Sequence, residues 1–324
     1  MTRLILTTGD SAAGGLKQTG LAEIVIPFGF QFASGMLPSD AEIAMCLRPT
    51  DRWLWDAYRN ALGEISHETG LIEACEGCET IELWIDPVPS AQLILIWLLD
   101  YLRPHKHIVS KLSLIQADRV IGNHPPDELV VWRLPAVKIR SDHLELASLA
   151  WQAYRATTPQ DWFDLLGKDT SALPQLGQAV LELLEELPMR ATGLGATEMR
   201  MLELIAAGDA SPSDVFPGHE KPNRRRVFGY WEVGSLLDDL AHCPAPLVSG
   251  IGEGPFTLEM HEDPERHARY KRSRLSLTTL GEAVLAQTED FSGHNPIHRW
   301  WGGTELTNDH LWRWDPASRS LIAP

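Results

Sequence analysis

The chain has 324 residues, of which 44% are hydrophobic and 22% are charged, and its formal net charge is −16. This composition is typical of a globular protein, and the length predicts more than one domain. The acidic excess argues against wholesale nucleic-acid binding, because phosphate affinity depends on lysine and arginine. No apolar run approaches the roughly 20 residues of a membrane-spanning helix, and we see no signal peptide. Four cysteines indicate no disulfide framework, so we expect a cytoplasmic protein without a membrane partner.

The first segment, residues 3–15 with the sequence RLILTTGDSAAGG, predicts a buried strand, a tight polar turn and then a helix that starts near Leu16. In open α/β sheets, such a turn builds a site at the carboxyl end of a strand. Gly9, Gly14 and Gly15 allow backbone amides to approach a ligand, and a helix N-terminus favours an anion. We therefore expect a ligand at the segment from Gly9 to Gly15.

Three more strands are predicted over residues 23–28, 80–85 and 111–116, with helices over 51–62 and 90–102. Alternating strands and helices imply crossover connections and a mainly parallel sheet, so we expect an α/β domain over residues 1–140. The carboxyl ends of its strands should gather polar residues, including Gln116, along one edge. The predicted ligand-binding residues are Gly9, Asp10, Ser11, Gly14, Gly15, Asp86, Gln92 and Asp118.

A helical connector is expected over residues 141–190. Residues 191–290 then predict helices over 197–207, 211–214, 230–241 and 279–287, with short strands over 247–248, 256–260 and 274–277. Three helices, a wing of strands and a closing helix are typical of a winged helix-turn-helix module. The basic residues placed for nucleic-acid contact in such a module are Arg224, Arg225, Arg226, Arg269, Lys271 and Arg272.

The third helix of this module opposes DNA binding, because its polar side chains include Glu232, Asp238 and Asp239 and no base-reading Arg, Lys, Asn or Gln. We therefore expect the winged-helix-like module to bind a protein partner or a second copy of the chain. A DNA-binding regulator remains an alternative interpretation.

The tail, residues 291–324, is rich in tryptophan and is expected to pack on the domains, with an aromatic wall for a ligand as the alternative. The C-x-x-C of Cys75 and Cys78 is open to two interpretations: a zinc or redox pair, or two separate thiols. We predict neither a metal nor a cofactor.

The first block also resembles that of the GDS-type (SGNH) hydrolases. The resemblance implies that Ser11 is a nucleophile and that Gly9 or Asn123 donates to an oxyanion. The D-x-x-H that supplies the base in that family has no clear counterpart here. The candidate bases are His67, His105, His107 and His124.

A second resemblance covers most of the chain. TGDSAAGGLK, IELWIDPVPSAQL, the GLGATEMRMLELIAAG helix and the closing RWWGGTEL with LWRWD are similar, in this order, to bacterial domain-of-unknown-function proteins that open with G-D-S-A-A-G-x-L. The resemblance implies an N-terminal α/β domain joined to a helical C-terminal domain. It carries over no activity. It maps the family's motif positions onto residues that include Gly9, Ser11, Trp84, Asp86 and Gln92.

The leading hypothesis is a ligand-binding or regulatory protein that holds a small anionic or nucleotide-like molecule at Gly9–Gly15. The alternatives are a serine hydrolase that uses Ser11 and a DNA-binding regulator.

Overall fold

The computed structural model describes residues 2–49, 52–208, 211–218, 221 and 223–324. The chain divides into two compact units. The first unit holds Met1–Phe32, Met36–Arg155 and Leu165–Ala179, and the second holds Ala33–Gly35, Ala156–Asp164 and Val180–Pro324. Among the helices described, none has the length and apolar character needed to cross a bilayer.

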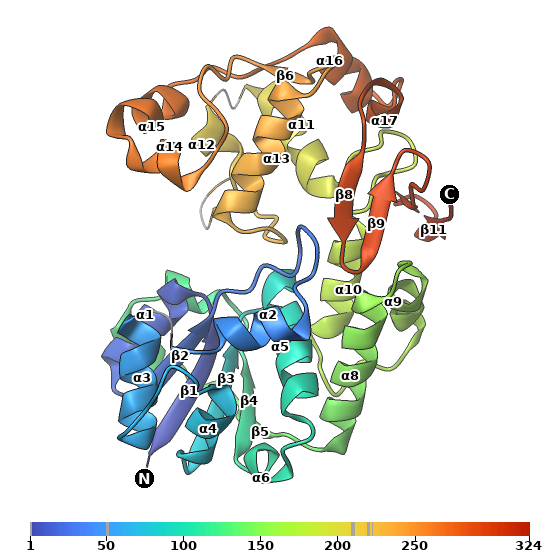
Figure 1. The fold of residues 1–324 in the computed structure, drawn as a ribbon. Helices are drawn as coiled ribbons and strands as arrows, with labels where there is room; N and C mark the ends of the chain where they lie inside the picture. Colours follow the sequence, from blue (N-terminus) through green and yellow to red (C-terminus); the bar gives the residue numbers. More distant parts are fainter. Residues whose placement is uncertain (1, 50–51, 209–210, 219–220, 222) are drawn as a thin grey trace. The chain divides into compact units, whose positions relative to one another are not determined.

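The first unit is built on a five-stranded sheet with the strand order β2–β1–β3–β4–β5 (Figure 1). Strands β1 to β4 are parallel, and the short edge strand β5 is antiparallel to β4. The prediction of a mainly parallel α/β sheet is therefore confirmed. The strands are β1 (Arg3–Thr8), β2 (Ile24–Phe28), β3 (Thr80–Ile85), β4 (Leu112–Gln116) and β5 (Val137–Lys138).

Helices cover both faces of this sheet because its strands carry apolar residues on both sides. Ile5, Val25, Trp84 and Ile115 pack in one core cluster with Leu16 of α1. On the other face, α5 packs against β3 and α8. The helices are α1 (Asp10–Thr19), α2 (Asp40–Cys46), α3 (Arg52–Leu62), α4 (Leu71–Glu76), α5 (Pro89–Leu102), α6 (Lys106–Val109), η1 (Ile121–Asn123), α7 (Pro126–Val131), α8 (Ser141–Arg155) and η2 (Leu165–Gly167).

The second unit is mostly helical and carries three small antiparallel strand pairs, β6 with β7, β8 with β9 and β10 with β11. Helix α10 (Leu176–Leu184) begins in the first unit and ends in the second. The other helices are α9 (Gln160–Asp164), α11 (Ala196–Ala207), α12 (Pro212–Val215), α13 (Tyr230–His242), α14 (Leu258–Glu262), α15 (Pro264–Lys271), α16 (Thr279–Leu285) and α17 (Phe291–His294). The strands are β6 (Val248–Ser249), β7 (Ser276–Leu277), β8 (His298–Trp301), β9 (Thr304–Thr307), β10 (Arg313–Asp315) and β11 (Ser320–Ile322).

The predicted strand over residues 256–260 is wrong. Thr257 caps a helix there, because its hydroxyl accepts a hydrogen bond from the Met260 amide, and α14 begins at Leu258. The alternating apolar and polar residues of this segment imitate a strand. The segment between β6 and β7 therefore contains two helices, and Arg269 and Lys271 lie on helix α15 instead of a β-wing.

Candidate functional site

The corner between β1 and α1 is formed by Gly9, whose φ of 92° lies in the region that favours glycine. Its amide donates to the Phe28 carbonyl at 3.1 Å, which continues the pairing of β1 with β2. Helix α1 begins at Asp10, so the predicted start near Leu16 is wrong. Gly14 and Gly15 consequently lie within the helix and do not line a loop.

The first turn of α1 is open to solvent. Asp10 and Ser11 are exposed, whereas Ala12 and Ala13 are buried against the sheet. The first amides of any α-helix have no partner within the helix, and no side chain caps α1. This turn can therefore offer backbone N–H groups to an acceptor.

Asp86 follows β3 and is 6% exposed. Its carboxylate accepts the Ile121 amide at 2.6 Å and the Thr8 hydroxyl at 3.4 Å. It thus connects the carboxyl ends of β1 and β3 to the turn η1. The structure brings Asp86 to the same sheet edge as Gly9, as predicted, and gives its carboxylate internal partners.

The turn η1 lies against the start of α1. A Cβ added to Gly122 would lie 2.8 Å from the Ser11 Cβ and 3.2 Å from the Ala12 amide nitrogen, so only glycine fits without a shift. Further along the helix, a Cβ added to Gly15 would lie 3.1 Å from the Cδ1 of Leu129 on α7. Two glycines therefore allow η1 and α7 to approach α1 closely.

Ser11 has no hydrogen bond to His67, His105, His107 or His124 in the described part of the chain. His107 contacts the Glu76 carboxylate at 2.9 Å, and His124 contacts that of Glu128 at 2.8 Å. The other ring nitrogen of His124 is buried without a partner. Since the Gly9 amide is bound to Phe28, one expected oxyanion donor is also occupied. The geometry assembles neither the base nor the complete oxyanion site of a serine hydrolase.

Asp118 is exposed and forms a long ion pair with Arg119, with 3.7 Å between the Asp118 Oδ1 and the Arg119 Nε. The Arg119 guanidinium lies over the ring of Trp132 at 5.1 Å. Asn123 is likewise exposed, on η1. Asp118 therefore lies on the surface beyond the end of β4, beside Arg119.

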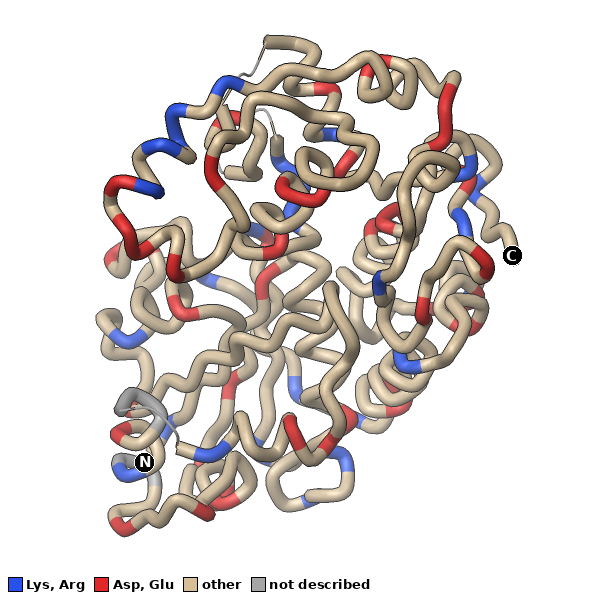
Figure 2. Tube along the Cα trace, turned by 45° about the horizontal axis from the view of Figure 1, so that its top comes forward, with Lys and Arg blue, Asp and Glu red and all other residues tan. Residues whose placement is uncertain are grey.

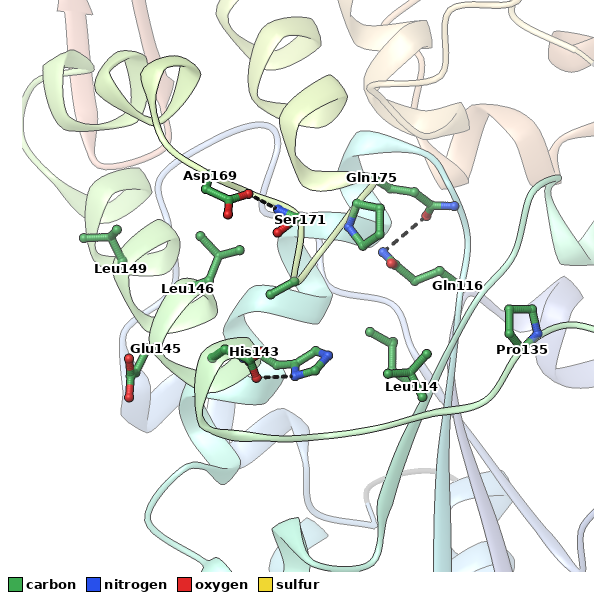
Figure 3. A pocket seen from close by; sticks show the side chains of 14 residues that line it. Leu114, Gln116, Pro135, His143, Glu145, Leu146, Leu149, Asp169, Ser171 and Gln175 are labelled. Carbon is green, nitrogen blue, oxygen red and sulfur yellow. Dashed lines mark hydrogen bonds and ion pairs between the residues drawn. The ribbon is translucent and has the colours of Figure 1, made fainter.

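A cavity of about 810 Å³ lies beside the carboxyl end of β4, wholly within the first unit (Figure 3). Its walls come from β4, β5, helix α8 and residues 169–175. Figure 3 shows Leu146 and Leu149 on one side and Leu114 and Pro135 on the other. The polar residues that line it are Gln116, Asp142, His143, Glu145, Asp169, Ser171 and Gln175.

Three glutamine side chains form one hydrogen-bond network at the wall of this cavity. Gln92 is 1% exposed and donates to the Asp86 carbonyl at 2.8 Å and to the Gln175 side-chain oxygen at 3.0 Å. Gln116 donates to the side-chain oxygens of Gln92 at 3.2 Å and of Gln175 at 3.5 Å. Gln175 donates to the Ala117 carbonyl at 2.5 Å. The network holds the amide groups of Gln116 and Gln175 in fixed orientations.

His143 lies on the first turn of α8 and is 6% exposed. Its Nδ1 lies 2.9 Å from the Asp142 carboxylate and 3.2 Å from the Arg140 amide nitrogen. The His143 backbone amide donates to the Asp142 carboxylate, and this bond holds the pKa of Asp142 below its usual value. The Ser171 amide likewise donates a hydrogen bond to the Asp169 carboxylate and lowers its pKa. Both carboxylates are therefore charged at neutral pH.

Most of these cavity residues were not predicted. Gln116 was expected at the sheet edge and Gln92 near it, and both are there. His143, Asp169 and Gln175 belong to segments without a local motif, which only the tertiary structure brings together.

Two of the arginines predicted to contact nucleic acid, Arg225 and Arg269, form ion pairs within the second unit. Arg225 donates to the carboxylates of Glu185 at 2.8 Å and Glu186 at 2.6 Å, and only 19% of its side chain is exposed. Arg269 bonds Glu253 at 2.5 Å. Figure 2 shows basic and acidic positions side by side along α14 and α15. Arg224 and Arg272, in contrast, are exposed.

The tryptophan-rich tail belongs to the second unit. The Trp301 indole donates to the Leu183 carbonyl at 2.8 Å, and Trp314 is 1% exposed. Trp300 and Trp301 also line a cavity of about 360 Å³ with Trp231 of α13. The tail thus forms both a packed core and an aromatic wall.

Cys75 and Cys78 are buried, unbridged thiols. Burial raises the pKa of both and brings that of Cys78 to about 11. Among the described residues, no group of three or more His, Cys, Asp or Glu side chains has an arrangement suited to a metal ion. Of the two interpretations, the geometry favours separate thiols.

No protein-family model matches the chain, and a search of curated proteins finds no similar sequence.

Proposed function

We propose that the chain is a cytoplasmic ligand-binding regulatory protein that holds a small anionic or nucleotide-like molecule at the first turn of α1, within the segment from Gly9 to Gly15. The reversal of strand order carries this proposal. From β1 the chain goes to β2 on one side of the sheet, and then to β3 on the other side of β1. In open α/β sheets, ligands bind outside the carboxyl ends of the strands at such a reversal.

Local features support an anionic group at this place. Gly9 and Asp86 follow β1 and β3 at the reversal, and Ser11 lies on the first turn of α1 directly after Gly9. The first turn of α1 offers amides without a side-chain cap, and the helix dipole places partial positive charge there. The Ser11 hydroxyl is exposed beside these amides and can donate a further hydrogen bond.

The second unit would then act as the interaction module. We propose that α11, α12, α13, the β6–β7 pair and α16 form a winged-helix-like module that binds a protein partner or a second copy of the chain. The acidic side chains of α13 and the internal ion pairs of Arg225 and Arg269 favour a protein over DNA.

A thermal-shift screen with nucleotides and phosphorylated metabolites tests the ligand site. We expect at least one compound to stabilise the native chain by more than about 1 kcal/mol at saturation. Ser11→Asp places a second carboxylate on the first turn, so it should repel an anionic ligand and weaken binding by about tenfold or more. The same substitution should leave the unliganded protein as stable as before, because negative charge is favourable at a helix N-terminus.

Ser11→Asn is the matched control, since asparagine has the shape of aspartate without its charge. Its affinity should stay within about threefold of the wild type, roughly 0.6 kcal/mol. Equal affinity of the Asp and Asn variants for a compound that stabilises the wild type would show that the anion lies elsewhere. No stabilisation by any compound in the screen would refute the proposed function.

A further inference from the structure

The cavity beside β4 has the size and lining of a ligand site separate from the corner at Gly9. Its volume of about 810 Å³ lies within the usual range for small-molecule sites. Leu114, Pro135, Val137 and Leu146 give it apolar walls, and a small number of polar groups converge on it. Such a combination fixes the orientation of a ligand while burying its apolar surface.

The glutamine network leaves one acceptor and one donor for a ligand. Both amide protons of Gln116 are used, on Gln92 and Gln175, while its side-chain oxygen accepts no hydrogen bond from the described residues. Gln175 uses one amide proton on Ala117 and has a second. In Figure 3 the two amide groups face each other at the cavity wall. An acceptor and a donor that lie together match the edge of a flat cyclic amide or amidine.

The charges around the cavity exclude an anion. Asp142, Glu145 and Asp169 line it, and the described lining residues include no lysine or arginine. Because Asp142 and Asp169 have lowered pKa values, they are negatively charged at neutral pH. A phosphate group in the cavity would be repelled by these carboxylates and would find no cationic partner.

We propose that this cavity binds an uncharged nucleobase or its nucleoside, with the base edge on Gln116 and Gln175. The ring packs between the apolar walls, as flat rings do in mostly apolar pockets. A glutamine amide uses the same two kinds of group, an acceptor and a donor, to read the N6 and N7 edge of adenine, and here two glutamines supply them. This proposal does not depend on an anion site at α1, because none of the residues from Gly9 to Gly15 lines the cavity.

Isothermal titration of the full chain with adenosine, guanosine, cytidine and uridine tests the proposal. At least one nucleoside should bind in a saturable way. In the Ser11→Asp chain, in which the anion site at α1 is weakened, the 5′-monophosphate should bind about tenfold more weakly than the nucleoside or worse. Ala172 lines the cavity, so Ala172→Phe places a large side chain at its wall and should abolish binding. Ala41→Phe, on the exposed surface of α2, is the matched control and should bind like the wild type.

Gln116→Met removes the free acceptor and should weaken binding by about tenfold or more, whereas Ser11→Asp should leave nucleoside affinity unchanged. Three results would overturn the proposal: no binding of any of the four nucleosides, unchanged affinity in Ala172→Phe, or equal affinity of the Ser11→Asp chain for nucleoside and monophosphate. Loss of anion binding in Ser11→Asp with intact nucleoside binding would separate this site from the one at α1.

Discussion

At the residue scale, the polar residues predicted to bind a ligand fall into two groups: those exposed to solvent and those hydrogen-bonded inside the protein. Ser11 and Asp10 are exposed at the start of α1, while Asp86 and Gln92 are buried and hold the ends of the strands together. An aspartate at the end of a strand can therefore have either of two roles, and the sequence alone does not distinguish them. It can bind a ligand, or it can replace missing backbone partners where the strand stops.

The cysteines give a direct test at this scale. Burial raises the pKa of Cys75 and Cys78, and thiol reactivity requires the thiolate, so both should be inert in the native protein. Cys46 is exposed and should react first with an aromatic disulfide reagent, followed by the half-buried Cys243. Cys75 and Cys78 should react only after unfolding. Fast reaction of Cys75 or Cys78 in the native chain would support the interpretation of the C-x-x-C as a redox pair.

At the element scale, close packing of η1 on α1 shapes the corner. The turn approaches the helix because Gly122 has no side chain, and this approach covers one side of the first turn. The resulting surface therefore depends on the missing side chain at Gly122.

Gly122→Ala should destabilise the first unit by about 1–3 kcal/mol, because the new methyl group would contact the Ser11 Cβ and the Ala12 backbone. The urea midpoint of the transition that includes the first unit measures the effect. Gly29→Ala is the control, since a Cβ there meets no atom within 4 Å, and it should stay within about 0.5 kcal/mol. Equal midpoints for the two variants would contradict the close approach of η1.

Helix α15 is held to the preceding loop by Glu253, which accepts hydrogen bonds from Arg269 and Arg266. The bond from Arg269, with a smaller contribution from Arg266, lowers the pKa of Glu253 in the folded state. A lowered pKa gives stability that is present above the unfolded-state pKa and is lost as the pH falls through the folded-state pKa. The stability difference between wild type and Glu253→Gln should therefore be largest at neutral pH. It should begin to fall near the ordinary glutamate pKa of about 4.3 and disappear below the lowered folded-state pKa.

Thermal unfolding of both proteins across pH 3 to 7 measures this difference. Since the other carboxylates titrate in both chains, subtraction isolates the contribution of Glu253. A difference that grows toward low pH would contradict the ion pairs of α15.

At the scale of the whole molecule, the net charge of −16 is distributed unevenly. Residues 219–275 contain nine Lys or Arg and nine Asp or Glu, so this segment is neutral and the remainder carries the entire excess. The ion pairs of Arg225, Arg266 and Arg269 reduce the number of cations available to phosphate. The chain should consequently bind DNA very weakly.

Fluorescence anisotropy with a labelled duplex at about 20 mM salt tests this expectation, because low salt favours phosphate contacts. We expect no saturable binding at micromolar protein. Saturable binding that weakens steeply with added salt would restore the DNA-binding alternative.

The sequence predicted the sheet well because its four parallel strands are short apolar runs that end at Gly, Pro or polar residues. It failed at α1, where Ala12 and Ala13 look like a loop of small residues but are buried in the first turns of the helix. It also failed at residues 256–260, where local alternation outweighed the capping threonine. The cavity beside β4 was beyond sequence reasoning, because Gln116, His143 and Gln175 are far apart in the chain and share no motif.

Chemical-shift mapping of the amides in the full chain tests the central claim most directly. The probes are AMP, ADP and inorganic pyrophosphate, added to the native protein. A ligand at the reversal of strand order should cause saturable shifts at the amides of residues 9–13, and Ser11→Asp should raise the ligand concentration needed for them by about tenfold or more. Saturable shifts confined to other residues, or none with all three probes, would contradict the assignment of the site.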